Sequence, residues 1–294
     1  MGPEYLTLEG VPQDYRWRPQ PPRAIGLIAG SWGDCLLGLG MFKALAGRGS
    51  LIVWSEYEDI TRLCSEQSFV DSVIYAKPAD SAEYNRIFGG LTRKEPDAMA
   101  AVVATVEDQS NIDLGHLTFY GLSPIAVQIG HMYRWTGAKL PMSTWRRAAS
   151  VAERLGPFVL FNPVSVNSAP FDDQWPLWNE ALAYAAQYSP YKVLVVGKGW
   201  ELGGSHPNVL NAIDSSLTMM EIFALAHMAS AVVTTCSGLA HWCAIQGLPA
   251  VVCGNEALSR RGSYFRSFLT VPNIEFIDKK EGLDSFVQAY SKVV

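Results

Sequence analysis

The sequence predicts an α/β protein of two Rossmann-like domains, each with a parallel sheet whose strands are joined by crossover helices. Short apolar runs alternate with stretches of helical spacing in both halves of the 294 residues, which is typical of βαβ units. A stretch richer in Gly, Pro and polar residues, 136–157, falls midway and is the expected linker. Hydrophobic residues make up 49% and charged residues 17% of the chain, as in a well-buried globular protein.

The first half starts with a Pro-rich lead-in, and its later apolar runs are expected to be buried strands. These runs are 24–30, 51–54, 72–76 and 101–105. The first run ends in Gly, and the letters "GSWGDCLLG" then lead from a Gly-rich turn into a helix. This turn lacks the Gly-x-Gly-x-x-Gly fingerprint of dinucleotide binding, so a nicotinamide or flavin nucleotide is not expected there.

The second half repeats the rhythm and ends in an amphipathic segment. Its expected strands are 158–161, 192–197, 230–235, 249–254 and 274–277. We therefore expect a first domain over 1–145, a second over 146–280, and a C-terminal helix over 281–294 that packs back on the first domain. Open parallel sheets bind ligands at the carboxyl ends of their strands, so the chemistry is expected in a cleft between the domains.

Composition and charge indicate the expected compartment and the classes of partner. The formal net charge of -5 gives no global basic field for nucleic acid, although a local basic groove is still open. Five cysteines without Cys-x-x-Cys spacing are expected to be free thiols in a reducing compartment. The acidic, Pro-containing N-terminus does not resemble a signal peptide, and no apolar stretch reaches the roughly 18 residues of a spanning helix. These features predict a cytoplasmic protein without a membrane span.

The stretch "VVTTCSGLAHWCAIQGLPAVV" carries the clearest binding signal. A strand ends at residue 235, Ser237 and Gly238 lie at the start of a helix, and Gly247 is expected to end it. A helix N-terminus with a glycine favours a phosphate, and His241, one turn further on, can add a side-chain donor, so the cluster predicts a diphosphate site. The alternative is a Ser N-cap with a His packed in the core.

The wider pattern over 216–254 resembles the donor-binding half of the heptosyltransferase-like glycosyltransferases. This is the ADP-heptose:lipopolysaccharide heptosyltransferase family, glycosyltransferase family nine, which has the GT-B fold. The matching positions are Ser237, Gly238, His241, Gly247 and Pro249. Cys236 stands where the family usually has Asp, which puts in doubt any role that needs a carboxylate there.

The first half supports the same resemblance through Gly33 and Asp34, which match a Gly-Asp of the family's acceptor domain. The resemblance implies that Asp34 is the general base that takes the proton of the acceptor hydroxyl. The alternative is a helix N-cap, for which Asp is also preferred. Trp32 can form part of a sugar platform or of the core, and His116 can lie in an acceptor loop or be structural.

The resemblance is incomplete between these two motifs. Trp175 and Pro176 are kept, but the basic residue that the family places before them is missing. Lys198 is therefore the expected cation for the diphosphate, followed by Arg260 and Arg261, with a solvated surface charge as the alternative for each. The pair Asp172 and Asp173 is not expected to bind a metal, because adjacent residues of an extended segment point in opposite directions.

The function that these features predict is inverting glycosyl transfer from a nucleotide-diphosphate sugar, used as a co-substrate without cofactor or metal. The expected acceptor is a saccharide or a lipid-linked glycan. A hydroxymethylated base of modified DNA is the second choice of acceptor. A nucleotide-sugar epimerase and a catalytically silent sugar-nucleotide-binding protein are the alternatives from other functional classes.

Overall fold

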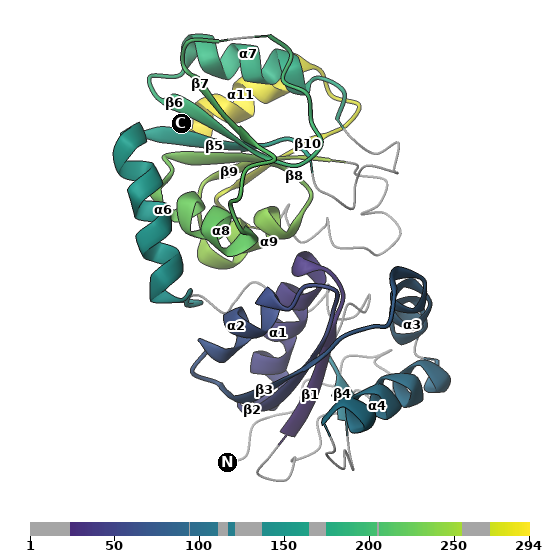
Figure 1. The fold of residues 1–294 in the computed structure, drawn as a ribbon. Coiled ribbons are helices and arrows are strands. Elements are labelled where there is room, and N and C mark those ends of the chain that lie inside the picture. The colour runs from purple at the N-terminus through teal and green to yellow at the C-terminus, as the bar shows by residue number, and fades with distance from the viewer. Residues whose placement is uncertain are drawn as a thin grey trace, which may run out of the picture.

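The computed structural model describes residues 24–93, 95–110, 117–120, 137–164, 175–204, 206–254 and 271–294. It contains two parallel sheets, each lying between two layers of helices, and Figure 1 shows the two units one above the other. The predicted α/β class with two Rossmann-like domains is confirmed.

The first domain has the strand order β3-β2-β1-β4. The strands are β1 (Ala24–Ala29), β2 (Gly49–Trp54), β3 (Val70–Ala76) and β4 (Leu117–Phe119). Alternate residues of β1 and β2 face opposite layers, because both faces of a crossover-connected sheet are covered. One layer holds α1 (Trp32–Ala46) and α2 (Asp59–Ser65), and the other holds α3 (Ser81–Arg93) and α4 (Pro96–Ser110).

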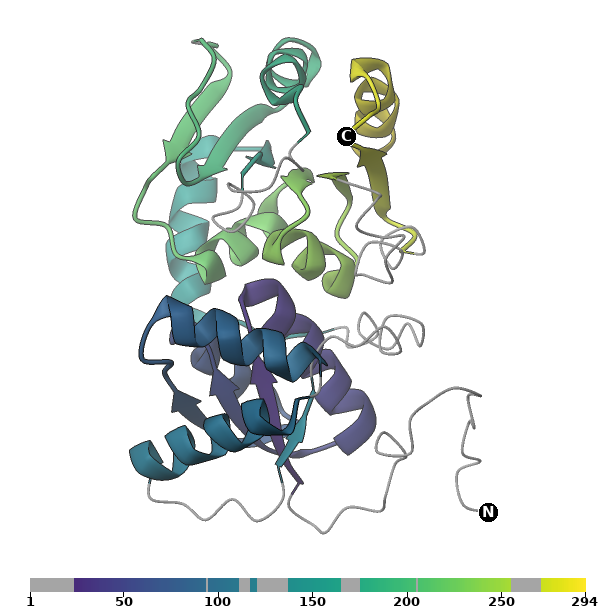
Figure 2. The ribbon, with the colours of Figure 1, turned by 90° about the vertical axis from the view of Figure 1, so that its right-hand side faces the viewer.

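The second domain has the strand order β10-β9-β8-β5-β6-β7. The strands are β5 (Phe158–Asn162), β6 (Lys192–Gly197), β7 (Val209–Ile213), β8 (Ala231–Thr235), β9 (Ala250–Gly254) and β10 (Ile274–Asp278). Helices α8 (Met219–Met228) and α9 (Gly238–Gln246) cover the face toward the first domain, whereas α7 (Trp178–Tyr188) and α11 (Leu283–Val293) cover the far face (Figure 2).

Two expectations from the sequence are wrong, and the expected linker is largely helical. The run 101–105 lies inside α4, where Val102 and Val106 share one buried helical face, so its β-branched residues misled the strand prediction. The expected linker, 136–157, still lies between the strands of the two domains, and most of it forms α6 (Met142–Leu155), which packs on α8 through a buried stripe that includes Ala148. The final helix, α11, buries Phe286 and Tyr290 in the core of the second domain rather than returning to the first.

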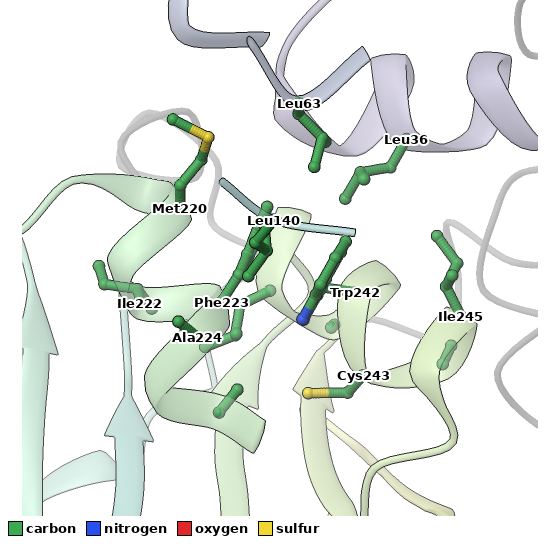
Figure 3. Packing of buried hydrophobic residues seen from close by; sticks show 14 of the residues in the cluster. Leu36, Leu63, Leu140, Met220, Ile222, Phe223, Ala224, Trp242, Cys243 and Ile245 are labelled. Carbon is green, nitrogen blue, oxygen red and sulfur yellow. The ribbon is translucent and has the colours of Figure 1, made fainter. Parts of the chain in front are cut away.

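The two domains share one hydrophobic core. Helices α1 and α2 face α8 and α9, and Figure 3 shows Leu36 and Leu63 of the first domain pointing toward Phe223 and Trp242 of the second. The Trp32 ring meets the Phe223 ring edge-on, with 5.5 Å between their centroids. Because α1 is buried both by its own sheet and by the second domain, it is apolar around most of its surface.

Candidate functional site

The strand orders locate a ligand-binding edge in each sheet. The chain moves from β1 to β2 on one side and places β4 on the other, so the order reverses between β1 and β4. The second sheet reverses in the same way between β5 and β8. Open α/β sheets bind ligands outside the carboxyl ends of the strands at such points. Helices α1 and α9 begin directly after β1 and β8, at these two edges.

The N-terminal ends of α1 and α9 are in direct contact. A Cβ atom added at Gly238 would lie 2.9 Å from Trp32 Cβ and 3.3 Å from the Gly33 backbone nitrogen. A Cβ added at Gly33 would lie 2.9 Å from His241 Cδ2. Both motif glycines are therefore needed for the close approach of two helices from different domains. The sequence did not suggest this packing role of the two glycines.

Asp34 lies in the first turn of α1, at the domain interface. Its Oδ2 accepts hydrogen bonds from the Ser31 backbone N–H at 3.0 Å and from the Ser31 hydroxyl at 2.8 Å. Ser31 is thus the N-cap residue, and Asp34 is its partner three residues later rather than the cap itself. The neighbouring Gly30 adopts φ +116°, and its lack of a Cβ leaves space for the Asp34 side chain, which a Cβ there would meet. The local backbone therefore fixes the direction of this carboxylate.

Ser237 occupies the N-cap position of α9, the position that the capping alternative predicted for it. Among the described residues its hydroxyl has no capping bond to the helix, and it lies 3.3 Å from Thr234 Oγ1. The helix ends at Gly247 with φ 67° and ψ 29°, the left-handed stop expected there. Burial raises the pKa of the neighbouring Cys236 thiol, and Cys253 raises it further. A neutral thiol therefore stands beside this helix end, where a carboxylate would repel an anion.

His241 is 6% exposed, and its ring lies against Gly33 of the other domain. Burial lowers the pKa of its imidazole to about 3. The ring is therefore neutral near pH 7, so it can donate or accept a hydrogen bond but brings no positive charge to the site.

Of the other predicted site residues that the structure describes, Trp32 lies at this contact and Lys198 does not. Lys198 is exposed after β6, and because β5 lies between β6 and β8 it follows a strand about 10 Å from β8. Trp32 packs on Phe223, which is a core contact. Outside the described residues lie His116, Asp172, Asp173, Arg260 and Arg261.

Two negative findings apply to the described part of the chain. It contains no group of three or more His, Cys, Asp or Glu side chains that could hold a metal ion. A helix long and apolar enough to cross a bilayer is likewise not found among the residues that the structure describes.

Two buried polar residues of the second domain were not predicted from the sequence. Glu221, in the first turn of α8, accepts a bond from the Thr218 backbone N–H at 2.8 Å and pairs with Arg147 of α6 at 2.7 Å. The letters "TMME" are a capping-box signal that could have located it. The second residue is Asn162, whose buried amide lies at the end of β5. Its only signal in the sequence was its place at the end of an apolar run.

Comparison with solved structures identifies the architecture. A glycosyl transferase family 9 protein from Veillonella parvula DSM 2008 has a TM-score of 0.58 and 13% identity, over 92% of this chain and 88% of that chain. The ADP-heptose lps heptosyltransferase II of E. coli has a TM-score of 0.59 and 15% identity, over 92% and 99%. E. coli heptosyltransferase WaaC with ADP has a TM-score of 0.55 and 15% identity, over 92% and 100%.

The chain has the GT-B fold of these transferases. At identities of 13–15%, the shared property is the arrangement of the two domains and not the residues of a site. No family model and no curated protein sequence matches the chain.

Proposed function

We propose that the protein is an inverting glycosyltransferase that moves a sugar from a nucleotide-diphosphate sugar to an acceptor hydroxyl. The observation that carries the proposal is the contact between the ends of α1 and α9. It places a carboxylate with a fixed direction, Asp34, at one switch point and the anion-favouring start of α9 at the other.

In the proposed reaction, Asp34 takes the proton of the acceptor hydroxyl while the oxygen attacks the anomeric carbon from the face opposite the diphosphate. The bond between that carbon and the diphosphate oxygen breaks, and the diphosphate leaves with the electron pair. The backbone N–H groups at Ser237 and Gly238 stabilise the developing charge, and neutral His241 donates a hydrogen bond. Lys198 is proposed to reach the diphosphate when the donor is bound.

The choice of donor is supported by what the structural neighbours bind. WaaC has been solved with ADP-2-deoxy-2-fluoro heptose, a nucleotide-diphosphate sugar, and shares the fold over 92% of this chain. A saccharide or lipid-linked glycan is the proposed acceptor. The net charge of -5 disfavours modified DNA, because it offers no general attraction for a phosphate backbone. No metal or cofactor is proposed.

The test is a panel of ADP-, UDP- and GDP-sugars, each with and without saccharide acceptors, assayed with and without EDTA. We expect transfer that needs an acceptor, survives EDTA and inverts the anomeric configuration of the product by NMR. Conversion of the nucleotide sugar without an acceptor would identify an epimerase instead. Ligand-induced stabilisation without turnover would identify a binding protein.

A further inference from the structure

Asn162 ends β5, and its side chain is 5% exposed. Its Oδ1 is fully buried and has no hydrogen-bond partner among the described residues. Buried side-chain oxygens are nearly always bonded, because an unpaired acceptor has lost its water without compensation. Such an atom in a native fold calls for a partner other than the residues that the structure describes.

The amide lies at the switch point of the second sheet. Asn162 pairs in register with Thr234 of β8, the strand on the other side of the reversal. Along β5, Phe158 and Leu160 point to the face covered by α8 and α9, and the alternation of a strand gives Asn162 the same face. Thr234 is also the residue whose hydroxyl lies 3.3 Å from that of Ser237. The amide is therefore one strand away from the proposed diphosphate position.

A glycine lies beside the amide oxygen. Gly197 ends β6 with φ +129°, and a Cβ atom added there would lie 3.0 Å from Asn162 Oδ1. Any larger residue would therefore crowd the oxygen.

We propose that Asn162 Oδ1 accepts a hydrogen bond from a sugar hydroxyl of the bound nucleotide sugar. An amide oxygen only accepts hydrogen bonds. Ionised phosphate oxygens only accept as well, so the diphosphate cannot satisfy Asn162. The groups next to a diphosphate are the ribose and the transferred sugar, both of which carry hydroxyl donors. The inference rests on the proposed function and adds to it a residue that selects the sugar portion of the donor.

The test compares two buried amides, one with an unpaired oxygen and one whose oxygen and nitrogen both have hydrogen bonds. Asn162→Leu replaces an unpaired acceptor with an apolar group of similar size. Gln67→Leu is the control: Gln67 is 3% exposed, its Nε2 donates to the carbonyls of Leu63 and Lys139, and its Oε1 accepts from the Lys139 N–H. We expect the ligand-free melting temperature of Asn162→Leu to equal or exceed that of the wild type, and that of Gln67→Leu to fall. A fall for Asn162→Leu as large as for Gln67→Leu would show that the amide is satisfied and overturn the inference.

Binding is measured by calorimetry with inorganic pyrophosphate, ADP, UDP, GDP and their sugar conjugates. Asn162→Leu is expected to lower the affinity for a nucleotide or its sugar conjugate about 3- to 10-fold, the usual effect of one hydrogen bond. Pyrophosphate, which has no sugar hydroxyl, is expected to bind Asn162→Leu and the wild type with equal affinity. Gln67→Leu is expected to bind every probe as the wild type does. Asn162→Ala, which cannot overpack, is the second variant.

The outcomes separate this inference from the proposed function. If the wild type binds nucleotides and the Asn162 variants bind every probe with unchanged affinity, the role of Asn162 is overturned and the proposed function is not. Equal weakening of pyrophosphate and nucleotide also overturns it, because the amide would then only support the fold of the site. A wild type that binds none of the probes overturns the proposed function and this inference with it.

Discussion

At the scale of single residues, the same atoms hold the fold together and form the proposed site. Asp34 completes the N-terminus of α1 through Ser31, and the proposed role as a base uses the same carboxylate. His241 fills the space beside Gly33, and its proposed role is to donate a hydrogen bond to the diphosphate. Capping and catalysis therefore have to be separated by variants that keep one role and remove the other.

Asp34→Asn makes that separation. Asn keeps the acceptor oxygen that binds Ser31, so the melting temperature is expected to stay nearly constant. Asn cannot take a proton near pH 7, so turnover is expected to fall by roughly 10²- to 10⁴-fold with little change in donor affinity. Asp34→Ala is expected also to lose about 1 kcal/mol of stability, because the hydrogen bonds from Ser31 to the carboxylate are removed. An Asn variant with near-normal turnover would remove Asp34 from the mechanism.

The buried imidazole of His241 predicts a pH-dependent stability. Burial lowers its pKa from 6.5 to about 3, so between these values the unfolded chain binds a proton that the folded chain does not. Folding stability is therefore lost as the pH falls from about 6.5 toward 3, by about 2 kcal/mol between roughly pH 7.5 and pH 5.

The measurement is urea unfolding at those two pH values for the wild type and for His241→Gln, which does not titrate. Subtracting the variant removes the contributions of the carboxylates and of His227, whose pKa burial also lowers. The idea fails if the two proteins lose the same stability between the two conditions.

At the scale of elements, the site depends on how closely two helices approach. The glycines at the starts of α1 and α9 set this separation, and α6 holds α8 beside them through the pair of Arg147 and Glu221.

Gly238→Ala is expected to force the two helices apart, because the new methyl group would meet Trp32 and the Gly33 backbone at 2.9 and 3.3 Å. Overpacking of this kind costs about 1–3 kcal/mol, and nucleotide affinity should fall with it. Gly282→Ala is the control for steric contact, since a Cβ there meets nothing within 4 Å and its φ is -80°. Because Gly282 is the N-cap of α11, its variant is expected to lose only the smaller capping preference, and so to melt above Gly238→Ala. Equal melting temperatures for the two variants would contradict the tight contact.

The sequence predicted the elements whose patterns are local. The helix over 238–246 and the strand over 192–197 are found at the expected bounds, because a Gly stop and an apolar run mark them. The partly exposed β7 was not predicted, since its run is neither apolar nor alternating. Register and strand order place Asn162 beside Thr234, so this part of the site is a tertiary property that single-sequence patterns do not contain.

At the scale of the whole molecule, one hydrophobic core crosses the domain boundary. Phe223 stacks on Trp242 with 4.8 Å between ring centroids, and Trp32 of the first domain meets Phe223 edge-on. Separating the domains would expose these rings to water, which is unfavourable by roughly 25 cal/mol per Å² of apolar surface.

We therefore expect the two domains to unfold together. Calorimetry of the full chain should give a single transition with matching calorimetric and van't Hoff enthalpies, and Trp fluorescence and far-UV circular dichroism should coincide. Trp242→Ala, which removes about 3–5 kcal/mol from the shared core, should shift that single transition without splitting it. Two resolved transitions in the wild type would show that the domains are independent.

The contact between Gly33 and Gly238 also limits how this chain can be recombined with others of its fold. A chimera that joins the first half of this chain to the second half of another GT-B protein would bring a foreign side chain against α1. Unless that partner has a glycine at the same place and a matching apolar helix pair, the graft would misalign the starts of α1 and α9 even if each half folded. The proposed donor preference is therefore expected to change more readily by substitution along the edge of the second sheet than by exchange of whole domains.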